Sequence, residues 1–172
     1  MISGGKAFRG DAVVSKTTER GSSPRAAAID LGIDNVVKGF QGPHRWLSNF
    51  HPSLIRYEGL TLDSVEHAYQ SAKCADAAER HQFRHITPGQ AKRLGRRVHI
   101  RSDWEDVREQ VMLDCLRLKF QWPLLRMNLL ATEDAILVEW NTWGDTFWGV
   151  TDKGGDNRLG KILMQVRSEI SE

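Results

Sequence analysis

The chain has 172 residues, of which 40% are apolar and 27% charged, so it is long enough for one globular domain with a substantial hydrophobic core. It contains no run of about 18 apolar residues, so the sequence predicts no membrane-spanning helix. A formal net charge of +2 is too small to indicate nucleic-acid binding by itself.

The two cysteines, Cys74 and Cys115, form no CxxC unit, and the N-terminal residues lack the apolar segment of a signal peptide. We therefore expect two free, buried thiols in a cytoplasmic protein. Residues 1–33 are poor in large apolar side chains and rich in Gly, Ser, Arg and Lys. Such a segment buries little surface, so we predict a flexible leader at 1–33 and one domain at 34–172.

Short β-structure is expected at the start of the domain. Residues 36–40 form a strand candidate, and residues 46–52 form a loop with aromatic side chains on both sides of Asn49. Residues 54–57 and 60–62 follow as a predicted hairpin, because the Glu-Gly dipeptide between them suits a tight turn.

A helix is predicted after this hairpin, with Asp63 or Ser64 as its cap, since both side chains can accept from free backbone amides. Its apolar stripe at helical spacing is Val65, Ala68, Tyr69, Ala72 and Ala75. A polar stripe beside it, at i, i+3, i+4 and i+7, is Glu66, Tyr69, Gln70 and Lys73. This arrangement places the Glu66 carboxylate at the edge of the core, where a pocket wall can be partly apolar and partly polar.

Residues 81–101 are strongly basic and contain no acidic residue. Thr87 and Pro88 predict the start of a short helix in this segment, which extends to about Val98. Its six cations are Arg84, Lys92, Arg93, Arg96, Arg97 and Arg101. Two interpretations stay open: a solvated helix face, or a site for phosphate groups on a small molecule or a nucleic acid.

The rest of the chain is predicted to supply scaffold elements and one further loop cluster. In order these are a helix at 104–120, a helix at 123–130, a strand at 135–140, a turn at 141–145, a strand at 146–150, a flexible loop at 151–156 and a last helix led by Asn157. A glycine-containing loop before a helix can hold an anion on backbone amides, but no Walker motif accompanies this one.

Acid–base chemistry is the reaction class that the residues favour. No metal-ligand motif occurs, and His67, His81 and His85 are expected to be surface histidines. No GxSxG or reactive-cysteine pattern occurs either. Glu66 is then the candidate general acid or base, provided that burial raises its pKa. The alternative, that Glu66 is an ordinary salt-bridge partner at a helix edge, stays open on these residues alone.

Asp145 stands between Trp143 and Trp148, which suits a flat, π-rich ligand held near a carboxylate. The alternative is that both tryptophans are core residues.

Four ordered blocks of the sequence resemble the YbiA-like, or NADAR, family. They are Leu47-Ser48-Asn49-Phe50, the run from Ser64 to Lys73, the run from Trp143 to Gly149, and Asn157-Arg158-Leu159-Gly160-Lys161 followed by Leu163-Met164. The resemblance extends from about residue 36 to residue 170. It implies a compact α+β domain that is mostly helical, with a few short strands.

The resemblance also implies hydrolysis of an N-glycosidic bond between ribose and a base nitrogen. Two substrates are associated with such proteins: ADP-ribose on guanine in nucleic acid, and phosphorylated ribosylaminopyrimidine intermediates of riboflavin synthesis. The basic segment favours the first. A different class, a non-catalytic module that binds ADP-ribose or NAD, is the remaining alternative.

Site residues follow from the matching blocks. Glu66 is carried over as the catalytic residue and Asn49 as a ligand contact. Further substrate-binding residues implied by the blocks and the basic segment are Tyr69, Lys73, Arg97, Trp143, Asp145, Trp148 and Asn157. No metal or nucleotide cofactor is required by this scheme, and the expected partner is the ribosylated nucleic acid or small molecule itself.

Overall fold

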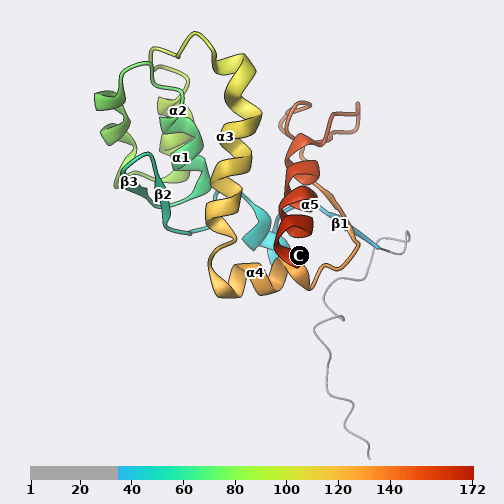
Figure 1. Ribbon diagram of the computed structural model, residues 1–172. Helices are drawn as coiled ribbons and strands as arrows, with labels where there is room; N and C mark the ends of the chain where they lie inside the picture. Colours follow the sequence, from blue (N-terminus) through green and yellow to red (C-terminus); the bar gives the residue numbers. More distant parts are fainter. Residues whose placement is uncertain (1–34) are drawn as a thin grey trace, which may run out of the picture.

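The computed structural model describes residues 35–172, and the leader predicted at 1–33 lies outside them. The predicted α+β class is confirmed: the described chain is mostly helical with a few short strands (Figure 1). The elements are β1 (Val36–Lys38), η2 (Gly42–Leu47), β2 (Ile55–Tyr57), β3 (Leu60–Leu62), α1 (Val65–Ser71), η3 (Ala77–Phe83), α2 (Pro88–Leu94), α3 (Trp104–Lys119), α4 (Pro123–Leu130), β4 (Ile136–Val138) and α5 (Arg158–Ser171). Neither α3, with 16 residues, nor another helix within 35–172 has the length and apolar character needed to cross a membrane.

Helix α1 lies at the centre of one half of the molecule and is buried along its whole length. It packs against α2, α3 and η3, with the β2–β3 hairpin at its start (Figure 1). The hairpin turns at Glu58 and Gly59, both at positive φ, as predicted for a two-residue turn. Because every residue of α1 is buried, Glu66, Tyr69 and Gln70 of its polar stripe are shielded from bulk solvent. The predicted burial of Ala75 is wrong, since α1 ends at Ser71 and Ala75 is exposed.

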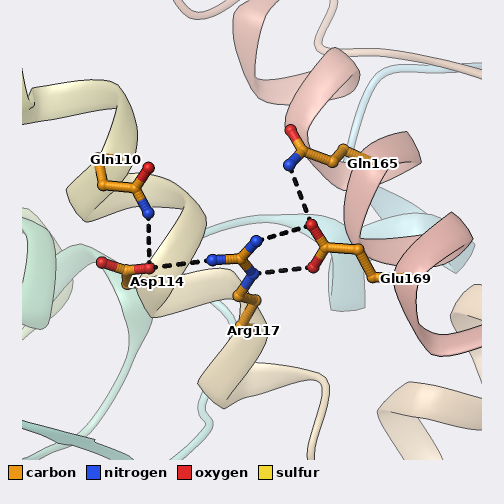
Figure 2. Close-up of polar contacts among 5 residues, drawn as sticks. All are labelled: Gln110, Asp114, Arg117, Gln165 and Glu169. Carbon is orange, nitrogen blue, oxygen red and sulfur yellow. Dashed lines mark hydrogen bonds and ion pairs between the residues drawn. The ribbon is translucent and has the colours of Figure 1, made fainter.

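The other half is built from α5, α4 and the parallel β1–β4 pair. Helix α3 joins the halves, because it contacts α1 on one side and α5 on the other. Figure 2 shows a polar link between α3 and α5, in which both Nε and Nη2 of Arg117 donate to Glu169, at 2.8 and 2.7 Å. Gln165 adds a third hydrogen bond, and these bonds lower the pKa of Glu169 to about 2. The pair is exposed, so it orients the two helices more than it stabilises them.

The predicted strand at 146–150 is wrong. Only an isolated bridge joins Val150 to Trp140, and the backbone before it is turned by side-chain bonds. Asp145 Oδ1 accepts from the backbone amides of Phe147 and Trp148, at 3.1 and 2.9 Å. Asn141 in turn bonds both the amide and the carbonyl of Asp145, at 3.0 and 2.8 Å. Backbone groups that are occupied in this way cannot enter a strand ladder.

Candidate active site

A cavity of about 830 Å³ opens where the two halves meet. Its walls come from the loop after η2, one side of α1, the first half of α3 and the segment that follows β4. Seven predicted site residues line it: Asn49, Glu66, Tyr69, Lys73, Trp143, Asp145 and Trp148. The structure thus brings together residues that are almost 100 positions apart in the chain.

Glu66 presents a carboxyl group to this cavity from a buried position, with only 6% of the residue exposed. Burial raises the pKa of Glu66, while a hydrogen bond from Gln70 Nε2 at 2.9 Å and the charges of Lys92 and Lys73 oppose the rise. Asp145 raises it further. A carboxyl poised between these influences suits proton transfer or stabilisation of a developing cation.

Asn49 lies directly against the start of α1, because its carbonyl accepts from the Glu66 amide at 3.0 Å. Its side-chain Nδ2 contacts Met112 Sδ at 3.5 Å, and its Oδ1 is buried with no hydrogen-bond partner among residues 35–172. An orphaned amide oxygen in a cavity wall is an acceptor for a ligand hydroxyl.

Lys119 fixes the loop that carries Asn49. Its side chain is fully buried, and Nζ donates to the carbonyls of Leu47 and Ser48 at 3.2 and 2.8 Å. Burial, and to a smaller extent the charge of Arg45, lower the pKa of Lys119 to about 7 against the opposing charge of Glu139. Sequence periodicity placed this residue only within a scaffold helix, and nothing local signals its burial.

The cations of the cavity come from two places. Lys73 projects from just beyond α1, and burial lowers its pKa while Glu66 opposes the shift. Lys92 lies on α2 with Nζ about 6.0 Å from the ring centroids of both Phe50 and Trp143, and Arg96 follows one turn later. Lys92 and Arg96 line the cavity, so the basic segment supplies charge to the site as well as to solvent.

The aromatic side chains differ in exposure and therefore in what they can do. Tyr69 is buried and packs against Trp104 and Trp148, at centroid distances of 5.0 and 5.5 Å. Trp148 is accordingly a packed wall residue. Trp143 is 56% exposed at the cavity rim, so its ring is accessible to a ligand in the cavity.

Two predicted site residues lie elsewhere. Arg97 is exposed and does not line the cavity, where its neighbour Arg96 takes the place. Asn157 supports β4 instead: its Nδ2 donates to the Leu137 carbonyl at 2.9 Å and its Oδ1 accepts from the Glu139 amide at 3.0 Å. The left-handed backbone of Asn157, at φ 52°, is a conformation that asparagine tolerates better than most residues.

The histidine prediction needs correction at one position. His67 is 1% exposed and lies 2.8 Å from Ser64 Oγ and 2.7 Å from the Ile86 carbonyl, so it ties α1 to the segment before α2. His81 and His85 are exposed as expected. Over residues 35–172 no group of three or more His, Cys, Asp or Glu side chains is arranged to hold a metal ion.

Glu139 is a cavity residue that the sequence did not single out. It comes directly after β4 and faces the same space as Glu66. A carboxylate inside an apolar run, between Val138 and Trp140, was the available signal.

Replacing Lys119 by Met should change the pH dependence of folding stability. The unfolded chain holds this proton up to about pH 10, whereas the folded protein releases it near pH 7. Between about pH 7 and pH 10 unfolding therefore takes up a proton. The free energy of unfolding of the wild type rises with pH in this range, by up to about 1.4 kcal/mol per pH unit. Urea unfolding at about pH 7 and pH 9 should show wild type gaining about 2 kcal/mol relative to Lys119→Met.

The matched control is Lys161→Met, since Lys161 is exposed on α5. Its pH dependence should parallel wild type. Parallel curves for Lys119→Met and wild type would show instead that Lys119 keeps an ordinary pKa when folded.

Comparisons of sequence and of structure with known proteins all find members of one family. The sequence model of the NADAR domain matches residues 38–171. N-glycosidase YbiA of Escherichia coli is 42% identical over 129 residues, covering 72% of this chain and 80% of that protein. Riboflavin biosynthesis protein VVA0006 of Vibrio vulnificus is 41% identical over 134 residues, covering 75% of this chain and 36% of that protein. The NMR structure of the E. coli protein YbiA superposes with a TM-score of 0.72 at 37% identity, covering 80% of this chain and 86% of that one.

Proposed function

The chain belongs to the NADAR domain family, and from that premise we propose that it is a hydrolytic N-glycosidase that cleaves the bond between a ribose and a base nitrogen. The observation that carries this proposal is the Glu66 carboxyl, buried in the wall of an 830 Å³ cavity that is lined by both cations and aromatic rings. Relatives bear the names N-glycosidase and riboflavin biosynthesis protein, which supports the same reaction class.

Cleavage of a ribosyl C–N bond builds positive charge on C1′ and on the ring oxygen. A carboxylate beside C1′ stabilises that charge and can accept a proton from the water that attacks the open face. Glu66 suits this role, because Gln70 and two lysines support its ionised form inside a desolvated wall. The low effective dielectric there strengthens its attraction for a cationic sugar.

The remaining contacts supply binding. Asn49 Oδ1 is free to accept from a ribose hydroxyl, and Trp143 offers an exposed ring at the rim for the base. Lys92 and Arg96 lie where a phosphate on the ribose can pair with them. Asp145 keeps one carboxylate oxygen for its own turn, so its second oxygen is the one available to substrate.

The substrate is a phosphorylated ribosyl base, and two members of that class are candidates. ADP-ribosylated guanine in nucleic acid is favoured by the cavity volume and by the exposed Arg93 and Arg96 beside Lys92. Phosphorylated ribosylaminopyrimidines are favoured by the names of the riboflavin-related relatives. We place the protein in the cytoplasm, because Cys74 and Cys115 are free thiols and the cytoplasm keeps thiols reduced.

The direct test is to incubate the protein with ADP-ribosylated guanine DNA and, separately, with ribosylaminopyrimidine phosphates, and to follow sugar release by mass spectrometry. Release from one substrate supports the proposal and identifies the substrate. Tight binding of ADP-ribose without release from either would instead favour a non-catalytic binding module.

Arg96→Ala and Lys92→Ala should each raise KM for the cleaved substrate about 10-fold or more, with a smaller effect on kcat, because each removes a charge-assisted contact to phosphate. Arg97→Ala is the matched control, since Arg97 is the adjacent cation and lies outside the cavity. It should leave KM within about twofold of wild type. The comparison is made from steady-state kinetics at fixed ionic strength, and equal effects at positions 96 and 97 would contradict the assigned phosphate site.

A further inference from the structure

Glu139 is held in the cavity wall by contacts on both sides of its backbone. Its amide donates to Asn157 Oδ1 at 3.0 Å, and its carbonyl accepts from the Val150 amide at 2.8 Å. A Cβ on Gly149 would lie 2.4 Å from the Glu139 carbonyl oxygen and 3.1 Å from its Cγ, so the neighbouring chain is in close contact. The backbone from which this side chain projects is therefore fixed by the fold.

The Glu139 side chain is partly buried, and one of its carboxyl oxygens has no structural partner in the described part of the chain that would explain this position. Within residues 35–172 its Oε2 is out of contact with solvent and has no hydrogen-bond partner. Burial, and to a smaller extent Asp145, raise the pKa of Glu139 to about 7 against the opposing charges of Lys92 and Lys119. Near neutral pH a carboxyl of this kind is divided between its protonated and ionised forms, so it can donate a proton to a ligand in the cavity.

The two cavity glutamates differ in how their surroundings treat a negative charge. Two lysines favour the ionised form of each carboxyl, Lys92 and Lys73 for Glu66 and Lys92 and Lys119 for Glu139. The difference is a hydrogen-bond donor: Gln70 donates to Oε1 of Glu66. Glu139 has no donor on its Oε2. Asp145 and Lys92 act on both carboxyls, which places the pair around a shared space. Pairs of carboxyls with unlike surroundings divide acid and base roles in glycoside hydrolysis.

We propose that Glu139 is a second catalytic carboxyl, the general acid that protonates the departing base nitrogen while the Glu66 carboxylate acts at C1′; this inference rests on the proposed N-glycosidase function. The C1′–N bond breaks, its electron pair stays on nitrogen, and nitrogen takes the proton of Glu139. Water adds to C1′ and gives one proton to Glu66. Transfer of that proton through solvent to Glu139 restores both groups, so the step is balanced without a co-reactant.

The test compares leaving groups. Glu139→Gln and Glu66→Gln are assayed on the N-ribosyl substrate that wild type cleaves and on 4-nitrophenyl riboside 5-phosphate, whose phenolate leaves without protonation. Glu139→Gln should lose about 100-fold in kcat on the first and less than about threefold on the second, whereas Glu66→Gln loses activity on both. Glu133→Gln, an exposed carboxyl-to-amide change just before β4, is the control.

A second readout does not depend on turnover. The ¹³C carboxyl resonance that disappears in Glu139→Gln should titrate near pH 7 in wild type. Equal losses of Glu139→Gln on both substrates, or titration near the ordinary glutamate value of about 4.3, would overturn the assignment of Glu139. Absence of turnover by wild type on every substrate would overturn the proposed function itself, which is a distinguishable result.

Discussion

Glu66→Gln should lower kcat by about 1,000-fold on the cleaved substrate while leaving KM within about threefold of wild type. The substitution keeps the size of the side chain and its place beside Gln70, but it removes the charge that faces C1′. An interaction made mainly in the transition state affects kcat more than substrate binding. Single-turnover measurement of sugar release separates this chemical step from product release.

Folding of the variant is the necessary control for this result. Glu66 is buried, and exchanging a buried carboxyl for an amide removes a desolvation cost, so the free energy of unfolding should not fall by more than about 1 kcal/mol. A parallel Gln70→Ala variant removes the donor on Glu66 Oε1 and should show a milder kcat loss. Wild-type turnover by a folded Glu66→Gln protein would exclude Glu66 from the mechanism.

Local chemistry explains why most elements could be predicted from the sequence. Helix α4 begins at Pro123 and ends at Leu130 as expected, because proline fits the first helical position and the apolar spacing continues for two turns. Helix α2 starts with the predicted Thr87 cap, reinforced by Gln90 in a capping box. These signals act within a few residues and need no tertiary contact.

The errors arise where distant segments decide the outcome. Helix α2 ends at Leu94, earlier than predicted, and the chain then approaches α1 so closely that a Cβ on Gly95 would lie 1.9 Å from Gln70 Oε1. That approach directs Arg96, and not Arg97, into the cavity. Residue spacing alone cannot fix which of two adjacent arginines faces a site.

Glu139 illustrates the same limit for the candidate site. Strand β4 pairs in parallel with β1, about a hundred residues earlier in the chain, and this pairing brings Glu139 to the cavity. Asn157 was expected to bind substrate, yet it fixes the backbone at Glu139. Four sequence blocks were therefore enough to indicate a site, whereas the division between lining and supporting residues required the structure.

Gly160→Ala should destabilise the fold by about 3 kcal/mol, because there is no room for a methyl group where α5 crosses β4. A Cβ at this position would lie 2.0 Å from the Leu137 carbonyl oxygen and 2.6 Å from both Nδ2 and Oδ1 of Asn157. The backbone oxygen cannot rotate away, so α5 and β4 must separate. That movement breaks the support of Glu139, and kcat should fall together with stability.

Gly89→Ala is the matched control, since it is also a helical glycine but has only ordinary contact, 3.7 Å to Arg93 Nη1. Alanine there lowers the entropy of the unfolded chain and should stabilise the protein by about 0.5 kcal/mol. Urea unfolding monitored by circular dichroism gives the free energy of unfolding of both variants. A loss for Gly160→Ala beside a gain for Gly89→Ala distinguishes steric overlap from a general effect of glycine replacement. Equal stability of Gly160→Ala and wild type would contradict the close packing of α5 on β4, and with it the fixed position of Glu139.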